Sequence, residues 1–178
     1  MRLSGAIVAA VLVVATPAFS PPSSAADVGP TSRFSDVDDD RFFTEPVGWA
    51  RQTGVINGYT DHCFLPDAVA TRAEVVTVIH RAMGSPAALA SHPFTDLTGE
   101  WQDAAVGWAA ETGVTTGIGM TTFAPDRAAT RAEVATFIWR AAGRPAGTTM
   151  PFLDVTRDWQ RPAVAWICLL YTSDAADE

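Results

Sequence analysis

The sequence contains no lysine, and its positive charge is sparse. All 12 basic residues are arginines, against 20 aspartates and glutamates, so the 178-residue chain carries a formal net charge of −8 at pH 7. A surface that binds nucleic acid through its phosphates needs clustered basic side chains. The charge balance therefore argues against nucleic acid as a partner, and any binding of an anion must be local.

Cysteine is also scarce. The chain has two cysteines, Cys63 and Cys168, and the second lies in a C-terminal segment whose origin is suspect. A single cysteine cannot build the internal disulfide framework of a small secreted domain. Stability is therefore expected to come from packing.

Long apolar runs are absent, except near the N-terminus. An apolar run over residues 6–15 is followed by a Pro/Ser-rich stretch, with the small residues Ser24 and Ala26 at the −3 and −1 positions of a cleavage site. This pattern is typical of a secretory signal peptide, and the run is short for a membrane span. We expect a signal peptide over 1–26, a linker over 27–33 and no membrane span after cleavage; a retained anchor is the alternative.

The C-terminus breaks the pattern that precedes it. Cys168–Glu178 reads CLLYTSDAADE and interrupts an expected helix in the middle of a repeat. The segment resembles the translated read-through of a sequencing adapter. We therefore expect residues 168–178 to be a non-native tail and leave them out of the expected fold.

The chain is rich in internal repetition. The motifs F-x-D, V-G-W-A, G-V-x-x-G, F-x-P-D and T-R-A-E recur in the same order. Trp49 precedes Thr71 by 22 residues, and Trp108 precedes Thr130 by the same 22 residues. A fixed period of this kind indicates repeated supersecondary units that bury their apolar faces on one another. The expected units cover residues 34–84, 94–143 and, incompletely, 152–167.

Each unit is expected to fold as helix, loop and helix. The first helix is predicted over Glu45–Thr53 and again over Asp103–Thr112, followed by Gly54 and Gly113 as left-handed caps. The second helix starts at the T-R-A-E motif and carries apolar residues at i, i+3, i+4 and i+7. The sequence therefore predicts an all-α fold of tandem repeats.

The hexamer ATRAEV occurs at Ala70–Val75 and at Ala129–Val134. In a helix that starts there, the threonine hydroxyl accepts from the third amide and the glutamate returns to the threonine amide, which is a capping box. Structural roles are thus expected for Thr71, Glu74, Thr130 and Glu133.

The arginine of the hexamer has no such explanation. Arg72 and Arg131 lie at the first helical position, where the helix dipole disfavours a cation by about 0.3–1 kcal/mol. One explanation is an internal carboxylate, and the other is an anionic ligand held by the arginine and the free helix amides. The candidate internal carboxylates are those of the F-x-D and F-x-P-D motifs, Asp36, Asp96, Asp67 and Asp126.

These motifs, in this order over residues 34–167, resemble the S-layer homology (SLH) domain. The resemblance implies a pseudo-threefold bundle of three units, whose grooves bind secondary cell-wall polymers, often anionic pyruvylated glycans. It implies an exported protein that is held without covalent bonds at the bacterial cell wall. It also implies a ligand-binding set of Arg72, Arg131, Trp49, Trp108, Gly58 and Gly117. As candidate internal partners of the arginines, Asp36 and Asp96 are expected to have structural roles.

The third unit departs from this pattern because it lacks the T-R-A-E helix, so at most two grooves contain the arginine. Other candidate sites fail on their own residues. The acidic run from Asp36 has Arg41 at the sixth position of an EF-hand loop and Val47 at the twelfth, where glycine and glutamate belong. The Asp61–Cys63 stretch has no second cluster for zinc, and no nucleophile–base pattern is present.

The sequence therefore predicts a non-catalytic module, with no metal or cofactor, that anchors a secreted protein by binding cell-wall polysaccharide. Two alternatives stay open. The repeats could form a helical scaffold that binds protein, or the chain could be the anchor of a truncated secreted enzyme whose downstream cargo domain is missing.

Overall fold

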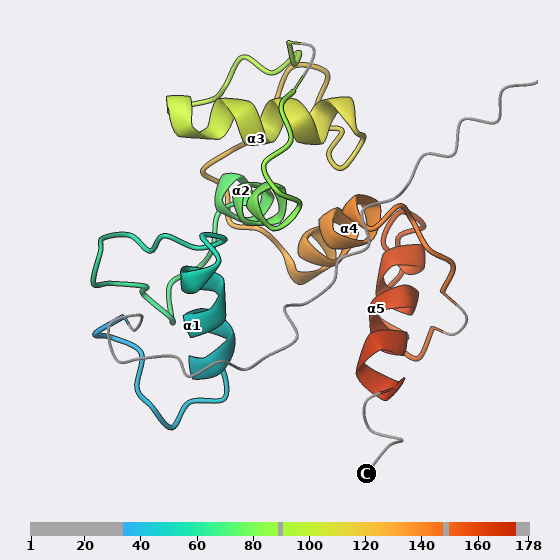
Figure 1. The fold of residues 1–178 in the computed structure, drawn as a ribbon. Helices are drawn as coiled ribbons and strands as arrows, with labels where there is room; N and C mark the ends of the chain where they lie inside the picture. Colours follow the sequence, from blue (N-terminus) through green and yellow to red (C-terminus); the bar gives the residue numbers. More distant parts are fainter. Residues whose placement is uncertain (1–33, 89–90, 148–149, 174–178) are drawn as a thin grey trace, which may run out of the picture.

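The computed structural model describes residues 34–88, 91–147 and 150–173, and this part of the chain consists of helices and loops without a strand. The predicted signal peptide and linker lie outside the described residues. The helices, labelled in Figure 1, are α1 (Thr44–Gln52), α2 (Arg72–Ala82), α3 (Glu100–Glu111), α4 (Arg131–Ala141) and α5 (Arg161–Ser173). The all-α repeat fold predicted from the sequence is confirmed.

Both T-R-A-E helices begin at a capping box. The Thr71 hydroxyl accepts from the Glu74 amide, and the Glu74 carboxylate accepts from the Thr71 amide at 2.7 Å. Thr130 and Glu133 make the same pair of bonds at the start of α4. Two otherwise unpaired backbone amides are satisfied at each helix start, which fixes where the helices begin.

Helix α3 begins three residues earlier than the sequence suggested. Gln102, which is 1% exposed, uses its side-chain oxygen to accept from the Thr98 amide and its nitrogen to donate to the Thr98 hydroxyl, both at 3.2 Å. These bonds tie the first turn to the preceding chain, with Gly99 as the N-cap residue. Helix α1 starts within one residue of the prediction.

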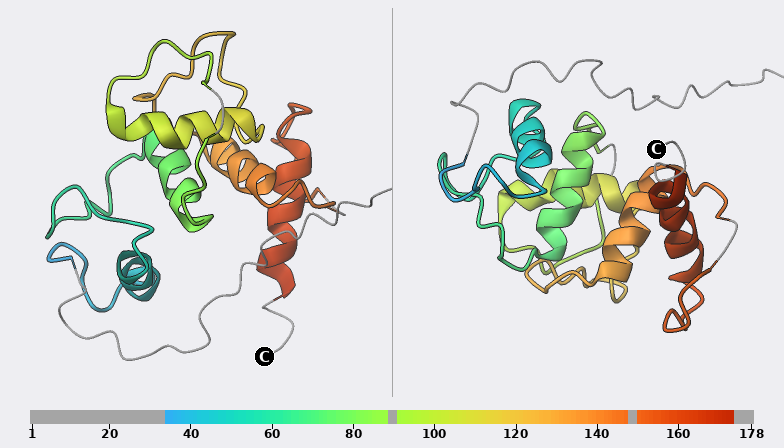
Figure 2. Two further views of the ribbon diagram at one scale, coloured as in Figure 1. Left: turned by 45° about the horizontal axis from the view of Figure 1, so that its top comes forward. Right: turned by 90° about the horizontal axis from the view of Figure 1, so that it is seen from below.

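The helices pair across the boundaries between units. Helix α2 packs against α3, α4 packs against α5, and α2 also touches α4. Figures 1 and 2 show these pairs, with α1 standing apart; it packs against no other helix of the described part. The second helix of one unit therefore packs against the first helix of the next. The pseudo-threefold closure implied by the resemblance stays a prediction.

The main hydrophobic core lies at the joint between the first two units. It combines Ala73 and Val76 of α2 with residues of the second unit, among them Val106, Phe123 and Phe137. A smaller cluster of Phe34, Val37 and Val47 lies under α1. Most of the main core therefore belongs to the second unit, and α2 of the first unit completes it.

Helix α5 runs through the suspected junction at Cys168 and continues to Ser173. The interruption expected in the middle of this element is therefore not seen, whereas the foreign origin of residues 168–178 stays a prediction. None of the helices in the described ranges combines the length and apolar character that a membrane crossing requires.

Candidate functional site

The loop between the two helices of each unit is held by the F-x-D carboxylate. Asp36 accepts from the amides of Phe64 at 2.9 Å and Leu65 at 2.7 Å. These bonds hold Leu65 at a φ of 60°, in the left-handed region that costs a residue with a side chain about 1–2 kcal/mol. The hydrogen bonds from Phe64 and Leu65 also keep the pKa of Asp36 below its usual value.

The second unit repeats this arrangement. Asp96 accepts from the amides of Phe123 at 2.9 Å and Ala124 at 2.7 Å, and Ala124 has a φ of 58°. Burial acts to raise the pKa of Asp96, but the bonds from Phe123 and Ala124 outweigh it, so the pKa lies below its usual value. Both aspartates therefore shape the loops instead of pairing with the hexamer arginines.

The two loop glycines of the expected ligand set are in tight contact with their own units. Gly58 has a φ of 78°, and a Cβ there would collide with the Phe34 ring and lie 2.7 Å from the Cys63 carbonyl oxygen. A Cβ at Gly117 would lie 2.5 Å from the Phe94 ring and 2.6 Å from a loop carbonyl. The fold requires glycine at both positions, independently of any ligand.

Arg72 is buried at the joint between the units. Its side chain is 2% exposed, Nε donates to the Phe123 carbonyl at 2.9 Å, and Nη1 donates to Glu133 Oε1 at 2.6 Å. The guanidinium also lies over the rings of Phe123 and Phe137, at 4.8 and 5.2 Å from their centroids. Every one of these partners belongs to the second unit.

The amides at the start of α2 are used in the same joint. Arg72 N donates to the Arg127 carbonyl at 2.9 Å, and Ala73 N donates to the Pro125 carbonyl at 3.1 Å. An antiparallel bridge joins Thr71 to Ala128. The positive end of α2 is therefore covered by the loop of the second unit and offers no free amides to an anion.

The internal partner of Arg72 is thus a carboxylate, but it is Glu133 of the second capping box and not an F-x-D or F-x-P-D aspartate. Burial raises the pKa of Glu133, whereas bonds from the Thr130 amide and the Arg127 side chain lower it by more. The net pKa lies below the usual value, so Glu133 is ionised beside the two arginines. Burial lowers the pKa of Arg72.

Arg131 starts α4 with the same local backbone geometry as Arg72 at the start of α2. Its side chain, however, is exposed, whereas that of Arg72 is buried. The φ and ψ of its N-cap, Thr130, are −77° and 153°, close to −79° and 163° at Thr71. Its side chain is exposed, and within the described residues neither its guanidinium nor the amides of Arg131 and Ala132 have a hydrogen-bond partner. The start of α4 therefore combines an open guanidinium with unpaired helix amides.

The structure does not bring the six expected ligand residues to one surface. Arg72 and Trp108 are buried, and Trp108 packs beside His80 with ring centroids 5.3 Å apart. Trp49 and the two glycines are half-buried, which leaves Arg131 as the exposed member of the set.

Two residues near the hexamers were not anticipated. Arg127 pairs with Glu133, and the Tyr59 hydroxyl donates to Glu74 at 2.6 Å. Both depart from the repeat, because Ala68 corresponds to Arg127 and Ile118 to Tyr59. This difference between the aligned units was the signal in the sequence that could have pointed to Arg127 and Tyr59.

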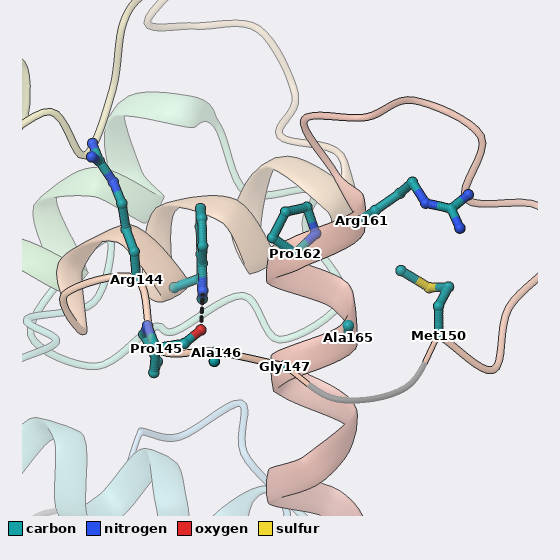
Figure 3. A pocket seen from close by; sticks show the side chains of 9 residues that line it. Arg144, Pro145, Ala146, Gly147, Met150, Arg161, Pro162 and Ala165 are labelled. Atoms are coloured by element: carbon teal, nitrogen blue, oxygen red, sulfur yellow. Dashed lines mark hydrogen bonds between the residues drawn. The ribbon is translucent and has the colours of Figure 1, made fainter.

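A shallow, open cavity of about 400 Å³ lies where the residues that follow α4 meet α5 (Figure 3). Trp139 is one of the residues that line it, and its ring nitrogen donates to the Pro145 carbonyl at 2.8 Å. The arginines at its rim bind backbone carbonyls: Arg144 donates to Gly113 and Arg161 to Val155, both at 3.3 Å. Both guanidiniums therefore already bind backbone carbonyls, so the cavity is a weaker candidate than the start of α4.

Comparison with family models identifies the repeats. The S-layer homology domain model matches residues 33–76 and 93–135. Each match includes one F-x-D loop and one T-R-A-E helix start, whereas residues 152–167 lie outside both. No curated protein matches the chain. S-layer homology domains are non-catalytic modules that anchor proteins at the cell wall. The motif order, the helical repeat fold and the two matches together show that the chain is an S-layer homology domain protein.

Proposed function

We propose that this chain anchors an exported protein by binding an anionic cell-wall glycan at the start of α4, with Arg131 as the main charged contact. The observation that carries the proposal is the open guanidinium of Arg131 beside the unpaired amides of Arg131 and Ala132. Helix N-termini with free amides favour anions, and an arginine binds a carboxylate or phosphate through two parallel hydrogen bonds.

The arginine of the first hexamer, Arg72, has a supporting role in this proposal. Arg72 keeps the second unit seated on α2, so it fixes the position of α4 relative to the rest of the molecule. Trp49, Gly58, Trp108 and Gly117 act in the same way, by shaping the units rather than by touching the polymer.

The overall charge supports a local contact. With a formal net charge of −8, the chain repels a polyanion at long range. Binding through one exposed arginine per site is then short-ranged and weakens as salt is added.

Binding to purified cell walls, measured by pull-down, tests the proposal. Arg131→Ala is expected to weaken binding about tenfold, which corresponds to about 1.4 kcal/mol. Arg157→Ala is the matched control, because Arg157 is also exposed and its loss changes the net charge equally. Equal binding by the two variants would overturn the assignment of Arg131.

Competition identifies the class of ligand. Free polysaccharide released from the same walls is expected to displace the bound chain. If wall-associated protein competes and the polysaccharide does not, the chain is a protein-binding scaffold, which is the alternative reading of the repeat.

A further inference from the structure

The joint at Arg72 shows what kind of surface fits a T-R-A-E helix start. The partner presents a carbonyl and a carboxylate to the guanidinium, from Phe123 and Glu133, and two further carbonyls to the helix amides, from Pro125 and Arg127. We call residues 123–133 the seated loop. We propose that the open start of α4 docks a second copy of this chain, whose residues 64–74 take the position that the seated loop takes at Arg72.

Residues 64–74, called here the free loop, offer the same groups in the same order. Phe64, Pro66 and Glu74 occupy the positions of Phe123, Pro125 and Glu133. The backbone also has the same shape, because an F-x-D aspartate binds the first two amides of each loop. The left-handed residues at their second positions have φ values of 60° and 58°. The free loop is therefore already in the conformation that seats on a helix start.

The first residues of the free loop are more exposed than those of the seated loop, whereas its last residues, from Ala70 on, already lie in the Arg72 joint. Phe123 is 0% exposed, whereas Phe64 is half-buried. Leu65 is 46% exposed and Val69 is 70% exposed, so two large aliphatic side chains of this loop face solvent. At the Arg72 joint the counterpart of Leu65, Ala124, is half-buried, whereas the counterpart of Val69, Ala128, stays exposed. Docking on α4 would therefore remove part of the Leu65 surface from water, which favours association.

The charges are complementary. Arg131 has no partner among the described residues, and Glu74 is the corresponding acceptor on the free loop. Glu74 Oε1 already accepts from the Tyr59 hydroxyl. At the intact joint, however, Glu133 Oε1 accepts from Arg72 and Arg127 together. One carboxylate oxygen therefore has room for two donors, and Tyr59 does not block Arg131 of the second copy.

The two surfaces of this interface are different, so the association is head-to-tail. In such an assembly one end carries an unpaired free loop and the other end carries an open helix start. Further copies can therefore add at both ends unless the assembly closes into a ring. Arg131 is also the glycan contact of the proposed function. Wall polymer and a second copy therefore compete for the same guanidinium.

Sedimentation velocity on the whole chain tests the proposal. The average mass is expected to rise with protein concentration and to return to that of a monomer in Arg131→Ala and in Val69→Arg. The second substitution places a bulky cation on the free loop at the position of Ala128, which bridges Thr71 at the Arg72 joint. It would therefore lie beside Thr130, next to Arg131, of the second copy, and the Val69 side chain is exposed. Arg157→Ala is expected to associate like the parent chain.

Mixing the two variants tests the head-to-tail geometry. Arg131→Ala keeps an intact free loop, and Val69→Arg keeps an intact helix start, so an equimolar mixture is expected to form one interface and stop at the mass of two chains. A parent chain that remains monomeric at all concentrations overturns the proposal, and so does a mixture that stays monomeric. The proposed wall binding is judged separately, because Val69→Arg is expected to lose self-association and keep wall binding.

Discussion

The two copies of ATRAEV are identical in sequence, and their arginines lie in opposite environments. Both helices begin at a capping box with nearly the same backbone angles. The guanidinium of Arg72 is buried and lies over the rings of Phe123 and Phe137, whereas Arg131 is exposed to solvent. The difference comes from what packs on the helix start, because the loop of a following unit covers α2 and no described segment covers α4. A motif therefore fixes local structure, and its neighbours decide whether its charge is structural or available.

The largest expected effect is on folding stability at the buried arginine. Arg72→Ala removes one partner of a buried ion pair and leaves the Phe123 carbonyl without its donor, so we expect a loss of about 3–5 kcal/mol. Arg131→Ala is expected to change stability by no more than about 0.5 kcal/mol, as at an ordinary surface site. Urea denaturation of both variants provides the measurement. If both variants lost a similar free energy of unfolding, the distinction between a structural Arg72 and an available Arg131 would be wrong.

The loop glycines provide a second comparison, within one unit. Gly58 and Gly54 both have left-handed φ values, 78° and 73°, but a Cβ meets the Phe34 ring and loop carbonyls at Gly58 and open space at Gly54. We expect Gly54→Ala to cost about 1–2 kcal/mol for backbone strain alone. Gly58→Ala adds a steric cost of about 1–3 kcal/mol. Thermal unfolding distinguishes the two; equal shifts would mean that the loop relaxes around the added methyl group.

The two joints between units can be compared through their closest small residues. At the first joint the Cβ of an added side chain at Gly107 would lie 3.4 Å from Ala88, which is nearly ordinary contact. At the second joint a Cβ at Gly147 would lie 2.6 Å from the backbone nitrogen of Trp166. Gly147→Ala is therefore expected to cost about 1–3 kcal/mol and to release α5, and Gly107→Ala to cost less. Hydrogen exchange in α5 reports the release, and unchanged protection there would contradict it.

The smallest expected effect is a dependence of stability on pH. The pKa of Glu133 is below its usual value in the folded chain, so its contribution is complete above the unfolded pKa of about 4.3 and is lost as the pH falls through the folded value. Glu133→Gln should therefore flatten the decline of stability below about pH 5, while Arg131→Ala should leave it unchanged. Denaturation midpoints measured from pH 7 to pH 3 compare the three proteins. A Glu133→Gln profile parallel to the parent would show that this carboxylate contributes nothing to acid sensitivity.

The local structure could be predicted from the sequence, because it depends on residues close together in the chain. The capping boxes and the glycine ends of α1 and α3 each depend on a few neighbouring residues. The partner of Arg72 could not be predicted in this way. It lies 61 residues further along the chain and is chosen by how the second unit packs on α2.

The early start of α3 shows the same limit on a smaller scale. It depends on a buried side-chain contact of Gln102 with Thr98. The left-handed conformation of Leu65 likewise depends on Asp36, which lies 29 residues earlier, and a leucine gives no local signal for it.

The reactivity of the two hexamer arginines with phenylglyoxal, followed by peptide mass spectrometry, distinguishes a structural from an available guanidinium. We expect that Arg131 is modified quickly in the folded chain, that Arg72 is protected until the chain unfolds, and that added wall polysaccharide slows modification of Arg131 alone. Equal modification of the two arginines in the folded chain, or a rate at Arg131 that the polysaccharide does not change, would contradict this expectation.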